Sequence, residues 1–143
     1  MTLDGKVLKT LPLNDILIAH QIPAAMSRYI LELNKQEKEL QRGSGLWLST
    51  PSGSTGGILS AGGKIMKEGS RRIQYLPREL YYKSGQSYKL KGAMVRNPLI
   101  IQSKMREGMI YIDGSHKKIA FSFGSVLRVE KSPHDLRLIS NES

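Results

Sequence analysis

The chain has 143 residues, of which 39% are hydrophobic and 24% charged, a balance typical of one folded domain and unlike that of a disordered segment. It contains no cysteine, which excludes a disulfide framework and a thiolate metal site and fits a reducing compartment. Lys and Arg total 22 against 12 acidic residues, and the formal charge of +10 favours anionic ligands.

The basic residues are scattered along the chain rather than gathered in one block, as in "SRR" at 70–72 and "HKK" at 116–118. Only two Phe and one Trp accompany them, few for the stacking of nucleic-acid bases, so nucleic acid is not the expected partner. The sequence shows neither a membrane-spanning apolar run nor a signal-peptide core, and we therefore expect a cytoplasmic protein without a membrane partner.

Alternating apolar residues predict strands in the first third of the chain, at 13–20 and 26–34. The polar run 34–39 predicts a hairpin turn that leads into a second strand-forming segment, 40–49. These elements come directly before the most unusual stretch of the chain, 46–63, "LWLSTPSGSTGGILSAGG".

Within that stretch, Ser54 or Thr55 can cap a helix over 56–67, the one helix that the pattern predicts. Four glycines lie inside or beside it, and each costs about 1 kcal/mol relative to alanine. A helix with so many glycines usually needs a close approach of its backbone to another group.

Strand signals return after Arg71, and Pro77 places its segment at a sheet edge, at a bend or between two short strands. The dipeptide Asp113-Gly114 predicts a hairpin turn. Further short strand segments are expected at 86–95, 108–114, 117–124 and 125–132. About eight to ten short strands and one glycine-rich helix predict a single, mainly β, sandwich-like domain over residues 1–143.

Two chemistries fit the 46–63 stretch poorly. A Walker phosphate loop ending at Gly63-Lys64 would need glycine where Ile58 stands and a hydroxyl where Ile65 stands. A nucleophile elbow centred on Ser54 lacks its first glycine, because Ser52 occupies that position. Partners for such a serine exist in Asp113 and in His116 or His134, but Asp113 and His116 fit a hairpin turn better.

A third interpretation is a nucleotide that lies against the loop and the helix N-terminus. The backbone N–H groups of Thr55, Gly56 and Gly57 would be available donors, and the hydroxyls of Ser54 and Ser60 would add further hydrogen bonds. A glycine-rich turn packed tightly under a sheet, without a ligand, explains the same residues equally well.

The motifs also resemble those of a known family. "LSTPSGSTGGILSAGG" (48–63) is similar to the signature of the NAD kinase family, and "LND" (13–15) to its motif of Asn followed by an acidic residue. "IYIDG" (110–114) and "FGSVLRVEKSP" (123–133) resemble its late strands. The run 13–30 is most similar to the NADH-preferring branch of plants and algae.

The resemblance implies the C-terminal β domain of a kinase that phosphorylates the adenosine-ribose 2′-hydroxyl of NAD(H) to give NADP(H), with ATP and Mg²⁺ as its other requirements. It also implies a homo-oligomer formed through this domain. The residues it implies for NAD(H) binding are Asn14, Asp15, Ser44, Thr55, Gly56 and Ser60. A carboxylate at Asp15 suits a pair of ribose hydroxyls because both can donate to it. Asp113 is expected to shape its turn.

Two departures from the family pattern affect this binding surface. Gly56-Gly57 stands where many members have Ala-Tyr, and Ser44 stands where bacterial members have an acidic residue. The loss of that charge is expected to alter the preference between NAD⁺ and NADH, which the sequence leaves open. We have no sequence-based explanation for Gly57.

The family's catalytic machinery is the larger departure. No aspartate of the chain follows a Gly-Gly pair, so the general base of the family's Gly-Gly-Asp-Gly motif, carried by an N-terminal ATP-binding α/β domain, has no counterpart here. No catalytic or metal-binding residue is therefore assigned, and the chain alone is expected to be inactive. The alternatives are a non-catalytic dinucleotide-binding or oligomerisation module and, with less support, a basic nucleic-acid-binding domain.

Overall fold

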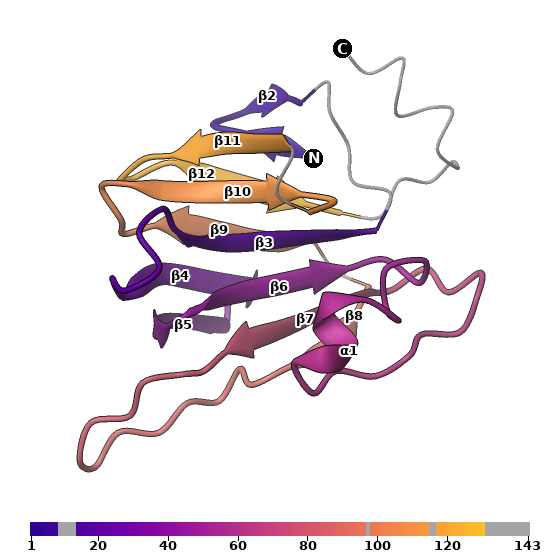
Figure 1. Ribbon diagram of the computed structural model, residues 1–143, viewed down its shortest axis with the longest axis horizontal. Coiled ribbons are helices and arrows are strands. Elements are labelled where there is room, and N and C mark those ends of the chain that lie inside the picture. The colour runs from indigo at the N-terminus through magenta and orange to yellow at the C-terminus, as the bar shows by residue number, and fades with distance from the viewer. Residues whose placement is uncertain (9–13, 97, 115–116, 131–143) are drawn as a thin grey trace.

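The protein is a sandwich of two antiparallel sheets (Figure 1). The computed structural model describes residues 1–8, 14–96, 98–114 and 117–130. The first sheet has the order β2 (Lys6–Val7), β1 (Thr2–Leu3), β12 (Val126–Val129), β9 (Leu99–Ser103), β4 (Ser27–Asn34), β5 (Glu37–Gly43). The second has the order β11 (Lys117–Phe121), β10 (Gly108–Ile112), β3 (Asp15–His20), β6 (Gly45–Ser49), β7 (Ile73–Arg78), β8 (Ala93–Val95). The expectation of a mainly β fold is confirmed, and no helix in the described ranges is long and apolar enough to cross a membrane.

The core lies between the two sheets, and alternate residues of strands such as β4, β9 and β10 point into it. On β4, for example, Tyr29 and Leu31 are fully buried, whereas Arg28, which precedes Tyr29, is exposed. The alternation read from the sequence therefore reflects one buried and one outer face per sheet. The core is formed by Ile16, Ile18, Tyr29, Leu31, Leu33, Leu46, Leu48, Ile73, Tyr75, Leu90, Leu99, Ile101, Met105, Ile110, Ile112, Phe121, Leu127 and Val129.

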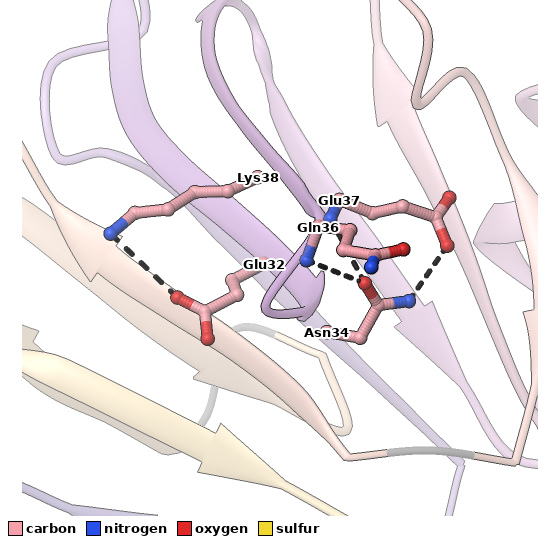
Figure 2. A network of polar contacts seen from close by, with 5 residues as sticks. All are labelled: Glu32, Asn34, Gln36, Glu37 and Lys38. Carbon is pink, nitrogen blue, oxygen red and sulfur yellow. Dashed lines mark hydrogen bonds and ion pairs between the residues drawn. The ribbon is translucent and has the colours of Figure 1, made fainter.

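The predicted hairpin at 34–39 is confirmed, and side chains fix its turn (Figure 2). The Asn34 side-chain oxygen accepts hydrogen bonds from the backbone N–H groups of Gln36 (2.8 Å) and Glu37 (3.0 Å). The Asn34 amide donates to the Glu37 carboxylate at 2.8 Å. A register shift between Glu32 and Asn34 places a bulge beside this turn, which is consistent with a short loop that contains no glycine.

The segment 40–49, expected to form one strand-forming unit, instead divides between the two sheets. β5 ends at Gly43 in the first sheet, and β6 begins at Gly45 in the second. Ser44 is therefore the residue at which the chain crosses from one sheet to the other, and its N–H donates to the Arg78 carbonyl at 2.8 Å.

Later segments show where alternation alone was insufficient. The predicted strand at 86–95 was wrong except for β8, because residues 79–92 instead form a long connection between β7 and β8. The strand β9 and the two-residue strands β1 and β2 were not predicted. Pro77 lies within the continuous strand β7, where it pairs with Leu46 of β6 but lies beyond the three residues that pair with β8. Of the three positions predicted for its segment, the structure thus shows a local edge on one side of β7.

A buried polar network attaches the 79–92 connection to β5. The Glu39 carboxylate accepts hydrogen bonds from the N–H groups of Lys89 (2.8 Å) and Leu90 (3.1 Å). The amide of Gln41, fully buried, donates to the Leu90 carbonyl at 2.6 Å, and its oxygen accepts from the Tyr29 hydroxyl at 2.7 Å. Burial raises the pKa of Tyr29, so the hydroxyl remains a protonated donor at neutral pH.

We predict that Tyr29→Phe lowers the free energy of unfolding by about 1–3 kcal/mol, because it leaves the buried Gln41 oxygen without its hydroxyl donor. Tyr111→Phe is the matched control, since the half-buried Tyr111 hydroxyl makes no hydrogen bond to the described residues. Urea unfolding of both variants measures the difference. Equal losses would show that the Tyr29 hydroxyl adds nothing specific.

Candidate functional site

Three neighbouring strands of the second sheet, β10, β3 and β6, have ends that lie side by side at one end of that sheet (Figure 1). The order β10-β3-β6 makes these strands neighbours, and they alternate in direction. The start of β3 at Asp15 therefore lies beside the end of β6 at Ser49, its register partner, and beside the end of β10. The loops that follow β6 and β10 and the residue that precedes β3 form the candidate site.

Asp113 holds the turn after β10 against the start of β3. Its Oδ1 accepts hydrogen bonds from the backbone N–H groups of Asn14 (2.8 Å) and Asp15 (3.1 Å). Its own N–H donates to the Asp15 carbonyl at 3.0 Å. The backbone φ angles of Asp113 (51°) and Gly114 (98°) are both positive, as the predicted hairpin turn requires. This side chain therefore organises the site.

The loop after β6 is held on the same stretch of backbone. The Asn14 carbonyl accepts hydrogen bonds from the N–H and the hydroxyl of Thr50, both at 3.0 Å. Gly53 then passes so close that a Cβ built on it would lie 2.1 Å from the Asn14 carbonyl oxygen. Glycine is the residue that allows this approach, and the loop path depends on it.

The helix differs from its prediction. α1 spans Gly57–Ser60 and not 56–67, and its N-cap is Gly56 without a side-chain cap. Ser54 is fully buried, and its hydroxyl donates to the Pro51 carbonyl (2.7 Å) and accepts from the Met66 N–H (2.8 Å). Capping by Ser54 or Thr55 was therefore wrong, and a buried, bonded Ser54 is no nucleophile. One helical turn also has too little dipole to bind an anion.

The glycines that follow α1 explain why it ends so soon. Gly62 has a φ of +103°, and its N–H donates to the Leu59 carbonyl at 3.0 Å. The Gly63 N–H donates to the Ile58 carbonyl at 2.8 Å, which completes a Schellman motif. The chain then runs beside Gln74, whose side-chain amide bonds both the N–H (2.8 Å) and the carbonyl (2.7 Å) of Lys64.

Packing against Trp47 explains Gly57. A Cβ built on Gly57 would lie 2.8 Å from the edge of the Trp47 ring. Trp47 lies on the outer face of β6, so the glycine lets α1 lie flat against an aromatic ring of the sheet. The indole Nε1 of Trp47 is buried and has no hydrogen-bond partner among the described residues.

Asp15 is the group in this region with a perturbed carboxyl. Partial burial raises its pKa, and the nearby charge of Asp113 raises the pKa further. Its side chain accepts no hydrogen bond from the described part of the chain. A Cβ built on Gly56 would lie 3.8 Å from Asp15 Oδ2, so the carboxylate faces the bare backbone of Gly56.

The structure brings together four of the six residues expected to bind a nucleotide. Asn14 is exposed, Asp15 is half-buried, and Thr55 and Gly56 are exposed on the loop that Asp15 faces. Ser60 is exposed at the end of α1. The remaining residue, Ser44, lies at the other end of β6.

At about 3.3 Å per strand residue, roughly 20 Å separate Ser44 from Thr50, so Ser44 does not join this cluster within one chain. The histidines considered as catalytic partners, His116 and His134, lie outside the described residues. Thr50, Gly53 and Trp47 were missed as site-building residues. The only sequence signal was the density of small residues around them, which does not say what they contact.

The fold is that of a β-sandwich domain, and comparison with known proteins gives its family. Residues 13–141 match the family model described as ATP-NAD kinase C-terminal domain. The chain belongs to this family.

Individual relatives agree with this assignment. The chain is 33% identical over 148 residues to a probable NADH kinase of Oryza sativa subsp. japonica, covering 99% of this chain and 46% of the relative. It is 29% identical to an NAD kinase of Methanospirillum hungatei, covering 85% of this chain and 44% of that protein. The chain thus spans less than half the length of these curated relatives.

Two solved structures share the fold. An NAD kinase from Archaeoglobus fulgidus, in complex with ATP, superposes with a TM-score of 0.71 at 21% identity. The superposition covers 94% of this chain and 55% of the Archaeoglobus chain. The yeast NADH kinase complexed with NADH gives a TM-score of 0.66 at 19% identity. This superposition covers 87% of this chain and 37% of the yeast chain.

We predict that Gly53→Ala lowers the free energy of unfolding by about 2 kcal/mol or more, because the new methyl group collides with the Asn14 carbonyl. Ser52→Ala is the control, because Ser52 is exposed in the same loop and its side chain makes no hydrogen bond to the described residues. Thermal or urea unfolding compares them. A Gly53→Ala protein as stable as Ser52→Ala would contradict the close approach.

We also predict that Asp15→Asn stabilises the protein near neutral pH, by up to about 1 kcal/mol after allowance for its exposure to solvent. Because its pKa is raised, the folded protein binds this proton more tightly than the unfolded chain. The stabilisation that this tighter proton binding gives to the folded state is fully present below the usual carboxyl pKa of 3.8, and it is lost as the pH rises through the raised pKa of the folded protein. The gain should therefore shrink as the pH is lowered.

Urea unfolding at about pH 7.5 and about pH 3.5 checks this. Asp4→Asn makes the same charge change, but Asp4 accepts a hydrogen bond from the Val126 N–H at 2.7 Å, so it should give no gain. A gain for Asp15→Asn that is independent of pH would argue against the electrostatic cause.

Proposed function

We propose that this chain supplies the NAD(H)-binding half of a kinase that phosphorylates the adenosine-ribose 2′-hydroxyl of NAD(H) with ATP. The observation that carries the proposal is the Asp15 carboxylate, which is partly buried, receives no hydrogen bond from the described residues and faces the bare backbone of Gly56. A carboxylate so placed can accept hydrogen bonds from the two hydroxyls of one ribose.

The neighbouring residues supply complementary groups. The exposed Asn14 amide has both a donor and an acceptor, and the exposed Thr55 and Ser60 hydroxyls can each donate or accept. Gly56 has no side chain to keep a ligand away from the Asp15 carboxylate, but its N–H is not the available donor that the sequence predicted, because it donates to the Gly53 carbonyl at 3.0 Å. Such a surface suits a polyhydroxylated ligand approached along its sugar edge.

The relatives support this ligand. One is named a probable NADH kinase, and the structural neighbours include an NADH kinase complexed with NADH and an NAD kinase complexed with ATP. ATP and NAD(H) are therefore the proposed substrates. The redox state that this chain prefers is a question for the binding experiment below.

Phosphoryl transfer itself needs groups from outside this chain. The described residues contain no cluster of three His, Asp or Glu side chains that could hold a metal ion, so we assign no step with Mg²⁺ to them. The aspartates are at 4, 15, 113 and 135, and none follows two glycines. We propose that a second domain, as long as the unmatched part of the relatives, provides the general base and the ATP site.

Ser44 enters this proposal in one way. It lies roughly 20 Å along β6 from the loop after that strand, and we propose that it approaches the same nucleotide from a second copy of the domain. Its role therefore depends on the expected homo-oligomer, which analytical ultracentrifugation of the chain would test.

The binding experiment uses Trp47, the one tryptophan of the chain, whose ring lies against Gly57. NADH bound beside Gly56 will quench its fluorescence by energy transfer. We predict that the quenching saturates and that Asp15→Asn lowers the apparent affinity for NADH by about tenfold or more, while Asp4→Asn leaves this affinity unchanged. Competition with NAD⁺ reports the redox preference. An Asp15→Asn protein with the wild-type affinity for NADH would count against the proposed site.

In this proposal, activity needs the second domain. The chain alone should form no NADP(H) in a coupled assay, and turnover by the isolated chain would refute that expectation. A chimera that joins the N-terminal part of the rice relative to residues 1–143 should be active and should lose activity with Asp15→Asn. A chimera that binds NADH without turnover would favour the non-catalytic dinucleotide-binding module.

A further inference from the structure

A row of basic side chains crosses the outer face of the first sheet. Arg28 on β4 and Arg42 on β5 are direct register partners, and both alternate with inward-facing residues. The Lys104 N–H donates to the Arg28 carbonyl at 3.1 Å, which places Lys104 on the other side of Arg28. Lys83 lines the same surface hollow as Arg42. These four residues form the cationic row.

No carboxylate neutralises the row within the described part of the chain. The ion pairs found there are Lys38–Glu32 and Arg128–Glu130, and neither involves the row. Like charges directly opposite each other on neighbouring strands destabilise a sheet. The Arg28–Arg42 pair therefore opposes folding, and a bound anion would compensate it.

The hollow at one end of the row is a shallow depression that is open to solvent. Its volume is about 380 Å³, and it is lined by Leu40, Arg42, Lys83, Ser84, Gly85 and Gln86. The turn on its far side is ordered, since the Gln86 N–H donates to the Lys83 carbonyl at 2.9 Å. The Tyr81 N–H donates to the Arg42 carbonyl at 2.7 Å and fixes the turn against β5.

The hollow is separate from the candidate nucleotide site. It lies where the 79–92 connection meets β5 of the first sheet, whereas α1 packs on Trp47 of β6 in the second sheet. Asp15 and Gly56 flank the end of β6, whereas Arg42 precedes its start by three residues. A ligand in the hollow would not touch the residues proposed to bind NAD(H).

We propose that the hollow and the cationic row bind a small ligand that carries two or more adjacent phosphate groups. Neighbouring strands lie about 4.8 Å apart, so Arg42 and Arg28 can each bind a different phosphate of one ligand, and arginine does so through two parallel N–H donors. Lys83 neutralises the ligand from the side of the turn.

The surroundings favour a small ligand over a nucleic-acid strand. Single strands bind where aromatic side chains line a basic groove, and here the residues directly beside the arginine pair on the sheet, Leu40 and Ile30, are aliphatic. The exposed Phe123 at the far end has Lys104 over its ring, with Nζ 5.1 Å from the ring centroid.

Two exposed aromatic residues, Tyr81 and Tyr82, precede Lys83 in the 79–92 connection. The oligothymidylate titration described below therefore tests whether bases stack on these rings.

Isothermal titration of the 143-residue chain with tripolyphosphate, pyrophosphate and orthophosphate tests the proposal. Tripolyphosphate should bind most tightly and orthophosphate least. Arg28→Gln/Arg42→Gln should weaken tripolyphosphate binding by about tenfold or more. The control Arg71→Gln/Arg72→Gln makes the same charge change on two exposed arginines outside the row and should retain the wild-type affinity.

A second readout does not depend on binding. Because the row opposes folding without an anion, Arg28→Gln/Arg42→Gln should unfold at a higher temperature than wild type. Tripolyphosphate should raise the midpoint of wild type and of Arg71→Gln/Arg72→Gln by more than that of Arg28→Gln/Arg42→Gln. Equal losses of affinity in both double variants, or no tripolyphosphate binding at all, would overturn the proposal. Tighter binding of a short oligothymidylate through the same arginines would also overturn it, in favour of a nucleic-acid surface.

Discussion

At one end of the second sheet, the backbone of Asn14 and Asp15 is hydrogen-bonded by two different loops, and the arrangement of the candidate site depends on this double attachment. The Asp113 side chain accepts hydrogen bonds from the N–H groups of Asn14 and Asp15, and Thr50 donates twice to the Asn14 carbonyl. Gly53 then closes over that carbonyl at a distance that no side chain permits. Two loops far apart in sequence thus have fixed positions relative to one short piece of backbone.

The two carboxylates at this edge have different physical situations. Asp113 is bonded by backbone donors and stabilises the turn, whereas Asp15 is partly desolvated beside it and accepts no hydrogen bond from the described residues. A desolvated acceptor without donors is unfavourable until a ligand supplies them, and binding sites commonly carry such a penalty. The cationic row is a second unfavourable arrangement of charge, here positive, because Arg28 and Arg42 repel each other across neighbouring strands.

Much of the fold was predictable because alternation reports burial directly. It identified β3 and β4, and the Asp113-Gly114 pair identified the hairpin between β10 and β11. The assignment of β5 and β6 to different sheets was not predictable, because pairing is a long-range property. Asp15 and Gly56 came from a family resemblance, whereas the contacts of Gly53 and Gly57 exist only in the folded chain. The cationic row escaped notice because its members are far apart in sequence.

The crossing at Ser44 has a consequence for how this domain can vary in evolution. On β5 the core-facing residues carry odd numbers, such as Gln41, and on β6 they carry even numbers, such as Leu46 and Leu48. The spacing across Ser44 therefore sets which side chains of the second sheet point inward. An insertion or deletion of one residue there would turn every following side chain of β6 inside out. Length should be strictly preserved at this position, while the 79–92 connection has room to change.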